Sequence, residues 1–333
     1  MTEQMPTQAI NFDKATVFYN LNSTNAKATL DYVQHRLERT NGRIPIHYAQ
    51  TSPDPEEMVE IYANNIDPGA NTMVGVVGGD WSINRVNKAR STLAEDYANT
   101  ALWAIAGGSS GNFLKSTIDR YYLSKPDLVL ELGRIISFRT MNIDIVTPAG
   151  DRITEEAITT IGFNGTHHMI DPVNSESHRA SKIRNLHIGR RAIGQWIADP
   201  PVILNGLIKA PVSFDYLNEV GEKNSVFEIL FINTPRVASL IRAREVSLSG
   251  PGHRIDIPRK QDLPLTLASV NLGESPGKDL LEPAVFRPLV DVAYQVDGDS
   301  RQNGKPLIAE AGSIVTIYQS EQPIGILQLE RAA

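Results

Sequence analysis

The chain has 333 residues, of which 41% are hydrophobic and 21% are charged, as in an ordinary globular protein that can bury a sizeable core. Its formal net charge of −6 argues against a general nucleic-acid-binding protein, which needs a basic surface. The absence of cysteine excludes disulfide bonds, thiolate chemistry and cysteine-ligated zinc. The N-terminus lacks a signal-peptide pattern, and no apolar run approaches the ~20 residues of a membrane span, so we expect a cytoplasmic protein, with peripheral contact to the membrane as an open alternative.

The first part of the chain alternates short strands with helices. After a loose leader at residues 1–14, the apolar runs at 15–19 and 44–48 have strand length and are bounded by turn-forming residues. Amphipathic helices are expected at about 26–39 and 56–64, the second with acidic residues in its first turn. This order of elements is typical of an α/β domain.

The clearest local motif is a strand, a tight turn and a helix within residues 72–87. The apolar run 73–77 stops at Gly78, Gly79 and Asp80, and apolar residues then recur at helical spacing. Glycines let the backbone approach a ligand, and a helix that begins directly after them presents N–H groups and a positive dipole end to a phosphate. Asp80 is suited either to cap this helix or to hold a metal ion. An ordinary α/β turn without a ligand is the alternative interpretation.

A second unit of the same kind follows. Residues 101–106 are a buried-strand candidate, 107–112 form a Gly-rich loop, and a helix is expected at 113–121. Alternating strands and helices indicate a mainly parallel sheet, whose ligands bind at the carboxyl ends of the strands. Because both Gly-rich loops fall at that edge, the sequence predicts a nucleotide-type site there.

The pattern changes after Pro126 to short apolar runs separated by turn signals, which predicts a mostly antiparallel β domain. One helical segment is expected within it, at about 177–198. We therefore assign 15–130 to an α/β nucleotide-binding domain and 131–333 to a β-rich C-terminal domain. The expected strands in the second domain lie at 128–132, 135–141, 143–147, 158–163, 211–214, 226–233, 246–248, 265–271, 290–296 and 314–319.

Four motifs occur in a recognisable order. They are Asn20–Ser23, Gly78-Gly-Asp-Trp-Ser-Ile-Asn-Arg-Val86, Gly107-Gly-Ser-Ser-Gly-Asn-Phe-Leu114 and Asp297-Gly-Asp299. Their order and spacing resemble the diacylglycerol kinase catalytic-domain family, which includes bacterial lipid kinases and sphingosine kinase-like enzymes and shares its N-terminal fold with NAD kinases. The resemblance implies a three-layer α/β domain followed by a mostly antiparallel β domain, with room for the last residues to pack back on the first domain.

The resemblance also implies an activity, the ATP- and Mg²⁺-dependent phosphorylation of a hydroxyl group on diacylglycerol or a related lipid. Such a site mainly aligns the reactants and neutralises charge. Catalysis would fall to Asp80 and to Asp297, which corresponds to the carboxylate that takes the proton of the acceptor hydroxyl. The residues implied on the nucleotide side are Asn20, Thr51, Gly78, Gly79, Asp80, Ser82, Ser110, Asn112 and Asp299.

The sequence departs from the family pattern at several site positions. Trp81 stands where the family has glycine, Arg85 where it has glutamate, Gly107 where it has proline and Phe113 where it has aspartate. Two alternatives therefore stay open: a catalytically inactive relative that binds a nucleotide or lipid, and a kinase of a soluble substrate such as NAD. The sequence argues against a P-loop NTPase and a Rossmann dehydrogenase, because neither loop carries the corresponding fingerprint.

Two further features concern ligands and partners. His167 and His168 are adjacent, which suits a turn or a substrate-facing loop better than a metal site on a helix. A basic cluster within 178–191 precedes an apolar stretch at 193–208, which is either an interfacial element that meets anionic lipid headgroups or an ordinary core helix. We expect a small-molecule hydroxyl substrate and no nucleic acid, and a homodimer is an open alternative.

Overall fold

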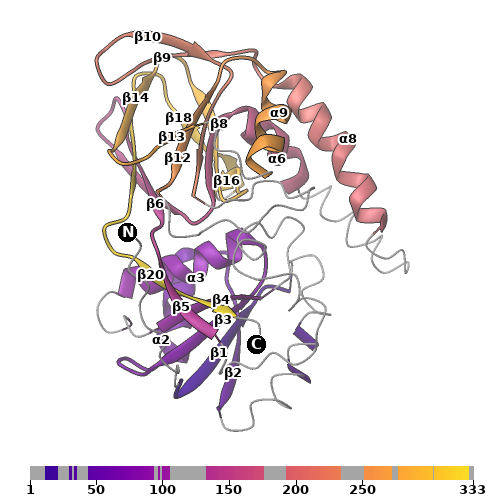
Figure 1. Ribbon diagram of the computed structural model, residues 1–333, viewed down its shortest axis with the longest axis vertical. Helices are drawn as coiled ribbons and strands as arrows, with labels where there is room; N and C mark the ends of the chain where they lie inside the picture. Colours follow the sequence, from indigo (N-terminus) through magenta and orange to yellow (C-terminus); the bar gives the residue numbers. More distant parts are fainter. Residues whose placement is uncertain are drawn as a thin grey trace. The chain divides into compact units, whose positions relative to one another are not determined.

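The computed structural model describes residues 12–21, 30–31, 34–35, 44–93, 97, 100–105, 133–175, 193–233, 251–271, 277–302 and 304–329. The chain forms two compact units (Figure 1). Unit 1 comprises Met1–Arg139, Ser247–Ser249 and Glu321–Ala333, and unit 2 comprises Thr140–Val246 and Gly250–Ser320. The second Gly-rich loop, with Ser110 and Asn112, lies outside the described residues.

Unit 1 is built on a six-stranded sheet in the order β2-β1-β3-β4-β20-β5. Its strands are β1 (Lys14–Tyr19), β2 (Ile46–Gln50), β3 (Thr72–Val77), β4 (Thr100–Ile105), β5 (Gly133–Phe138) and β20 (Ile324–Leu329). Strands β1 to β4 are parallel, and β20, from near the end of the chain, pairs parallel with β4 and antiparallel with β5. The carboxyl ends of β1 to β4 therefore meet at one edge.

Helical residues pack on both faces of this sheet. Helices α2 (Pro55–Asn65) and α3 (Asp80–Leu93) pack against each other, and Tyr62 of α2 stacks on Phe18 of β1 with ring centroids 5.5 Å apart. The neighbouring residue Val17 points to the opposite face, as successive strand residues do, and clusters there with Leu30. Unit 1 is thus a three-layer α/β domain, as the sequence predicts.

Unit 2 is a sandwich of two six-stranded sheets, and every strand pair described in it is antiparallel. One sheet has the order β10-β9-β14-β19-β6-β7, with strands β6 (Met141–Val146), β7 (Arg152–Ala157), β9 (Phe214–Leu217), β10 (Lys223–Val226), β14 (Ala284–Pro288) and β19 (Ile314–Gln319). The other has the order β13-β12-β11-β8-β15-β18, with strands β8 (Thr160–Asn164), β11 (Glu228–Ile232), β12 (His253–Ile257), β13 (Lys278–Asp279), β15 (Val292–Val296) and β18 (Ile308–Ala309). The short strands β16 (Arg301–Gln302) and β17 (Lys305–Pro306) pair separately.

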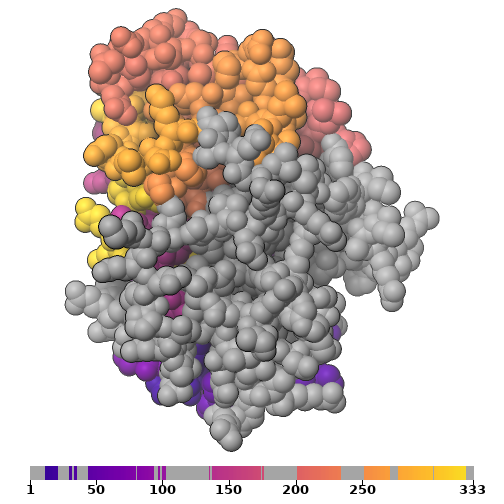
Figure 2. All heavy atoms as spheres, in the orientation of Figure 1, coloured from indigo at the N-terminus to yellow at the C-terminus, as the bar shows by residue number. Residues whose placement is uncertain are grey.

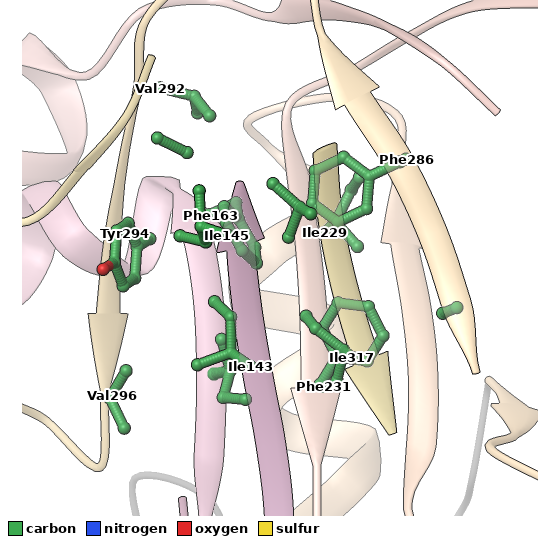
Figure 3. Close-up of a cluster of buried hydrophobic side chains, with 14 of the residues drawn as sticks. Ile143, Ile145, Phe163, Ile229, Phe231, Phe286, Val292, Tyr294, Val296 and Ile317 are labelled. Atoms are coloured by element: carbon green, nitrogen blue, oxygen red, sulfur yellow. The ribbon is translucent and has the colours of Figure 1, made fainter. Parts of the chain in front are cut away.

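The apolar core of unit 2 lies between the two sheets. Ile143 and Ile145 of β6 meet aromatic side chains of the other sheet (Figure 3). Phe163 of β8 is central, with Phe286 edge-on at 5.0 Å and Tyr294 stacked at 5.6 Å. Alternate residues of each strand face this core, which leaves the other face of the β8-containing sheet to helices.

Three described helices belong to unit 2: α6 (Gly165–Asn174), α8 (Ile193–Lys209) and α9 (Asp262–Asn271). The expected strand at 265–271 is wrong, because Leu263, Leu267 and Val270 recur at helical spacing and pack as one side of α9 on a second apolar cluster. The expected turn or loop at His167 and His168 is also wrong, since both residues lie in α6. Of the helical segment expected at 177–198, the structure describes only the part from 193 onward, and there α8 extends to Lys209. Among the described helices, none is both long and apolar enough to cross a bilayer.

Candidate functional site

Two polar residues of unit 1, Asn20 and Thr51, lie beside Gly78 at the carboxyl edge of the parallel strands. The backbone N–H of Thr51, after β2, donates to the carbonyl of Tyr19 at 2.9 Å. The N–H of Asn20, after β1, donates to the carbonyl of Val77 at 3.0 Å, directly before Gly78. Strand β1 lies between β2 and β3, so this edge contains the point where the chain changes direction across the sheet, the usual ligand position in such folds.

Gly78 is required by close packing in this turn. A Cβ at position 78 would lie 2.5 Å from both Cβ and Oγ of Ser82, and 3.7 Å from Cβ of Asn20. The Asn20 Nδ2 group donates to Ser82 Oγ at 3.1 Å. The turn after β3 is thus tied to the end of β1 by a side-chain hydrogen bond, and three of the residues implied by the resemblance lie together.

Helix α3 begins at this turn. The N–H of Ile83 donates to the carbonyl of Gly79 at 3.2 Å, so Gly79 occupies the capping position and Asp80 is the first helical residue. Asp80 therefore lies one residue beyond the N-cap position, so it does not hold the capping role considered for it. The N–H groups of this first turn form an anion-binding end of the helix.

Two departures from the family pattern contact each other on α3. The guanidinium carbon of Arg85 lies 5.0 Å from the ring centroid of Trp81, one helical turn earlier. This is the distance of a cation–π interaction. The substituted residues therefore form a pair on the first turns of the helix.

In unit 2, Asp297 and Gly298 form the two-residue turn of a β-hairpin. Both have positive φ, 52° and 83°, and Val296 and Asp299 exchange backbone hydrogen bonds of 2.9 and 2.8 Å. This is the pattern of a type I′ turn, for which Asp-Gly is a favoured sequence. Asp299 Oδ1 accepts the backbone N–H of Arg301 at 3.2 Å. The Asp297-Gly-Asp299 motif therefore has a structural role of its own.

The carboxylate of Asp297 is buried and binds the connection between β7 and β8. Its Oδ2 accepts the N–H of Ile158 at 2.7 Å. Its Oδ1 accepts the N–H and hydroxyl of Thr159 at 2.6 and 2.7 Å, and the N–H of Thr160 at 3.0 Å. From the other side, Asn233 binds the carbonyls of Ile158 and Thr159. The aspartate thus satisfies a row of buried N–H donors.

A second buried carboxylate, Glu228 of β11, lies at the start of α6. It accepts the N–H of Thr166 at 2.8 Å and its hydroxyl at 2.5 Å, and burial raises the pKa of Glu228 to about 8. Gly162 leaves the necessary space, because a Cβ there would lie 1.9 Å from Thr166 Oγ1 and 2.7 Å from Glu228 Oε1. Gln295 completes the group by donating to Thr160 Oγ1 and accepting from the N–H of Gly298.

Helix α6 carries an ion pair with Arg301 and a buried histidine. Arg301 donates to both oxygens of Asp171, at 2.6 and 2.8 Å, and this lowers the pKa of Asp171. His167 contacts the carbonyl of Tyr294 through Nδ1 at 2.8 Å, and burial lowers its pKa. Within the described residues, no group of three His, Asp or Glu side chains has the arrangement of a metal site.

The implied site residues thus fall into two groups. Asn20, Thr51, Gly78, Gly79, Asp80 and Ser82 lie at one edge of the unit 1 sheet, and Asp297 and Asp299 share one turn in unit 2. Thr159, Glu228 and Gln295 were not anticipated from the sequence. The Asp297-Gly298 pair follows an apolar run, a sequence pattern that is typical of a β-hairpin turn. In contrast, nothing in the sequence next to Glu228 indicates that its side chain is buried.

No family model matches the sequence, and no curated protein matches it. Solved structures do match. A diacylglycerol kinase from Bacillus anthracis str. Sterne shares 11% identity at a TM-score of 0.61, covering 95% of this chain and 96% of that one. Two further diacylglycerol kinase-like structures from the same strain have TM-scores of 0.60 and 0.58 at 10% and 11% identity, each covering 97% of this chain and 98% and 99% of their own. The chain therefore has the two-unit fold of bacterial diacylglycerol kinase-like proteins.

Proposed function

We propose that the protein is an ATP-dependent phosphotransferase that phosphorylates a hydroxyl group of diacylglycerol or a related lipid. The observation that carries the proposal is the grouping of Asn20, Gly78 and Ser82 beside the N-terminus of α3. A glycine turn without space for a Cβ, followed by a helix end, is a phosphate-binding arrangement. The order of motifs along the chain supports the kinase assignment.

In this proposal unit 1 binds the nucleotide. The N–H groups of the first turn of α3 neutralise phosphate charge, and Asn20 and Ser82 hold the turn in place. Asp80, as the acid of that turn, is the residue we assign to a Mg²⁺ ion, which would supply charge neutralisation on the phosphates. The chain offers the oxygen ligand that Mg²⁺ prefers there.

Asp297 is the residue we assign to the acceptor hydroxyl. As the acceptor oxygen bonds to the γ-phosphorus and the bond to the leaving ADP oxygen breaks, the hydroxyl proton passes to the carboxylate. The hydrogen bonds from Ile158, Thr159 and Thr160 fix the orientation of that carboxylate.

The first test is a calorimetric titration with ATP and Mg²⁺, followed in parallel by tryptophan fluorescence, because Trp81 neighbours the proposed phosphate position. We expect saturable, Mg²⁺-dependent binding that Asp80→Asn weakens strongly. Asp67→Asn is the matched control, since Asp67 pairs with Lys14 at the opposite, amino-terminal edge of the same sheet and its side chain is 73% exposed. An absence of binding at millimolar ATP would contradict the nucleotide assignment.

The second test measures ATP consumption with diacylglycerol in mixed micelles and, separately, with NAD. We expect turnover with the lipid that is lost in Asp80→Asn and in Asp297→Asn. Full lipid kinase activity in both variants would contradict the assigned roles. Activity with NAD but not with diacylglycerol would mean that the acceptor is a soluble molecule and not a lipid.

Two observations favour a second candidate, a catalytically inactive relative that binds a nucleotide or lipid. The Asp297 carboxylate already accepts four hydrogen bonds from its own chain, and Trp81 and Arg85 occupy positions where the family has glycine and glutamate. Under this candidate ATP binds but is not consumed with any acceptor. The Trp81→Gly, Arg85→Glu double variant is then expected to create activity.

A further inference from the structure

Helix α6 of unit 2 holds the chain that follows the Asp297 turn. Its Asp171 accepts hydrogen bonds from Nε and Nη2 of Arg301 at 2.6 and 2.8 Å, so the guanidinium group binds both carboxylate oxygens. The hydroxyl of Ser300, a fully buried residue, donates to the same carboxylate at 3.0 Å. In Figure 1 α6 accordingly lies beside β16, which begins at Arg301. One carboxylate therefore fixes two successive residues on the outgoing arm of the turn.

The same helix also holds the strand that leads into the turn. His167 lies about one helical turn before Asp171, so the two side chains share a face of α6. The Nδ1 atom of His167 lies 2.8 Å from the carbonyl oxygen of Tyr294 in β15. Because a carbonyl oxygen only accepts hydrogen bonds, Nδ1 carries the proton and donates it there. His167 and Asp171 therefore bind both arms of the hairpin whose turn contains Asp297.

Helix α6 is itself fixed at its start by Glu228 of β11, a strand of the same sheet as β15. The fully buried Glu228 carboxylate accepts the N–H and the hydroxyl of Thr166, in the first turn of the helix. Within the hairpin, Gln295 Oε1 accepts the N–H of Gly298 at 2.7 Å. The turn is thus connected by side-chain hydrogen bonds to a helix that is anchored on the sheet.

We propose that Asp171 and His167 are positioning residues that orient the Asp297 carboxylate. They act through the backbone of residues 294–301, which they bind on either side of the turn. Loss of the Asp171 carboxylate would release the outgoing arm and let Asp297 move away from the amides that it accepts. The catalytic consequence rests on the proposed function: a misdirected carboxylate would lower turnover and leave ATP binding by unit 1 unchanged.

The first readout is amide hydrogen exchange of the full chain by NMR, which requires no activity. The N–H groups of Ile158, Thr159 and Thr160 all donate to Asp297, so their exchange reports whether the carboxylate stays in place. In Asp171→Asn we expect these three amides to exchange roughly tenfold faster, the equivalent of one lost charge-assisted hydrogen bond. The amides of β11, in the same sheet, should exchange as in the wild type.

Variants at His167 test the second contact. His167→Leu removes the N–H donor to Tyr294 and should also accelerate exchange of the three amides, by less than Asp171→Asn because the lost bond joins uncharged groups. His167→Asn keeps an N–H donor near the position of Nδ1, so it should restore part of the protection. Equal acceleration by leucine and asparagine would overturn the role of His167.

The second readout is steady-state kinetics in the lipid kinase assay. Asp171→Asn should lower kcat roughly tenfold with KM for ATP unchanged, because the acceptor carboxylate is misplaced while the nucleotide site is intact. Adding Arg301→Gln should lower kcat little further, since both substitutions break the same ion pair. Faster amide exchange with an unchanged kcat would overturn the catalytic consequence.

A second ion pair of unit 2 provides the matched control. Arg259 binds both carboxylate oxygens of Asp262 at 3.0 and 3.2 Å, and the side chains of Asp262 and Asp171 are 24% and 21% exposed. Asp262 begins α9, and Figure 2 shows the orange region of α9 on the surface of unit 2. Arg259→Gln and Asp262→Asn should leave kcat and the exchange of the three amides unchanged.

Two results would overturn the orienting role of Asp171. One is wild-type exchange of the three amides in Asp171→Asn. The other is equal acceleration in Asp262→Asn, which would indicate a general loss of stability. A wild-type protein that consumes no ATP with any acceptor would contradict the proposed function alone, because amide exchange still decides whether α6 orients Asp297.

Discussion

The carboxyl edge of unit 1 and the Asp297 turn of unit 2 hold their polar residues in different ways. At the edge, backbone hydrogen bonds between parallel strands bring Asn20, Thr51 and Gly78 side by side, and the Asn20 side chain donates to Ser82. In unit 2 the Asp297 carboxylate is buried and satisfies N–H groups about 140 positions earlier in the chain. Substitutions at the edge should therefore affect ligand binding most, and substitutions at Asp297 should affect folding as well.

The largest effect should come from Asp297→Ala. It leaves the buried N–H groups of Ile158, Thr159 and Thr160 without an acceptor, and we expect a loss of about 3–5 kcal/mol in the free energy of unfolding by urea denaturation. Asp297→Asn keeps one acceptor oxygen and tolerates the positive φ, so its loss should be much smaller. Equal losses in the two variants would mean that the carboxylate does not hold the turn.

A pH-dependent effect should come from Glu228. Its pKa is raised from 4.5 to about 8 in the folded protein, so between these values the native state binds more protons than the unfolded state. Stability from this group is present below pH 4.5 and falls as the pH rises toward 8, by an amount on the order of a few kcal/mol. Glu228→Gln should remove this slope, measured as urea midpoints from pH 5 to 8. A slope identical to that of the wild type would contradict the raised pKa.

A medium effect should come from Gly78→Ala. The new Cβ would overlap Ser82, which we expect to cost about 1–3 kcal/mol of stability and to distort the proposed phosphate turn. Ser82→Gly removes both overlapping atoms, so the double variant should regain part of the loss. Additive losses in this cycle would show that the two positions do not interact.

The smallest effect should come from the Trp81 and Arg85 pair. A double-mutant cycle with Trp81→Leu and Arg85→Gln isolates their interaction from the other contacts of Arg85, and we expect a coupling of about 0.5–1 kcal/mol. A large loss of stability in Trp81→Leu alone would instead indicate a core role. ATP titration of the same variants would show whether the Trp81–Arg85 pair also affects ligand binding at the carboxyl edge of unit 1.

The sequence alone determined the parts that depend on local pattern. The alternation of short strands and helices predicted the α/β layering of unit 1, and the glycines after β3 predicted a tight turn ahead of α3. Parallel strands bring their ends to one edge, so Asn20, Thr51 and Gly78 could be expected together once the topology was inferred. The repeated short runs likewise predicted an antiparallel β unit.

Only the tertiary structure decided the features that depend on distant partners. Glu228 has no local mark of burial, yet its side chain accepts the N–H of Thr166 in the first turn of α6, the helix that contains His167, where the sequence suggested a turn or loop. The 265–271 segment became a helix because its apolar residues face a cluster built from β11 and β12. Asp297 resembles a catalytic motif by sequence, whereas its hydrogen bonds to Ile158, Thr159 and Thr160 arise only when β15 pairs with β8. The spacing of apolar residues along the chain specifies helices and strands. The hydrogen-bond partners of a buried polar side chain depend instead on which distant donors the fold brings within reach.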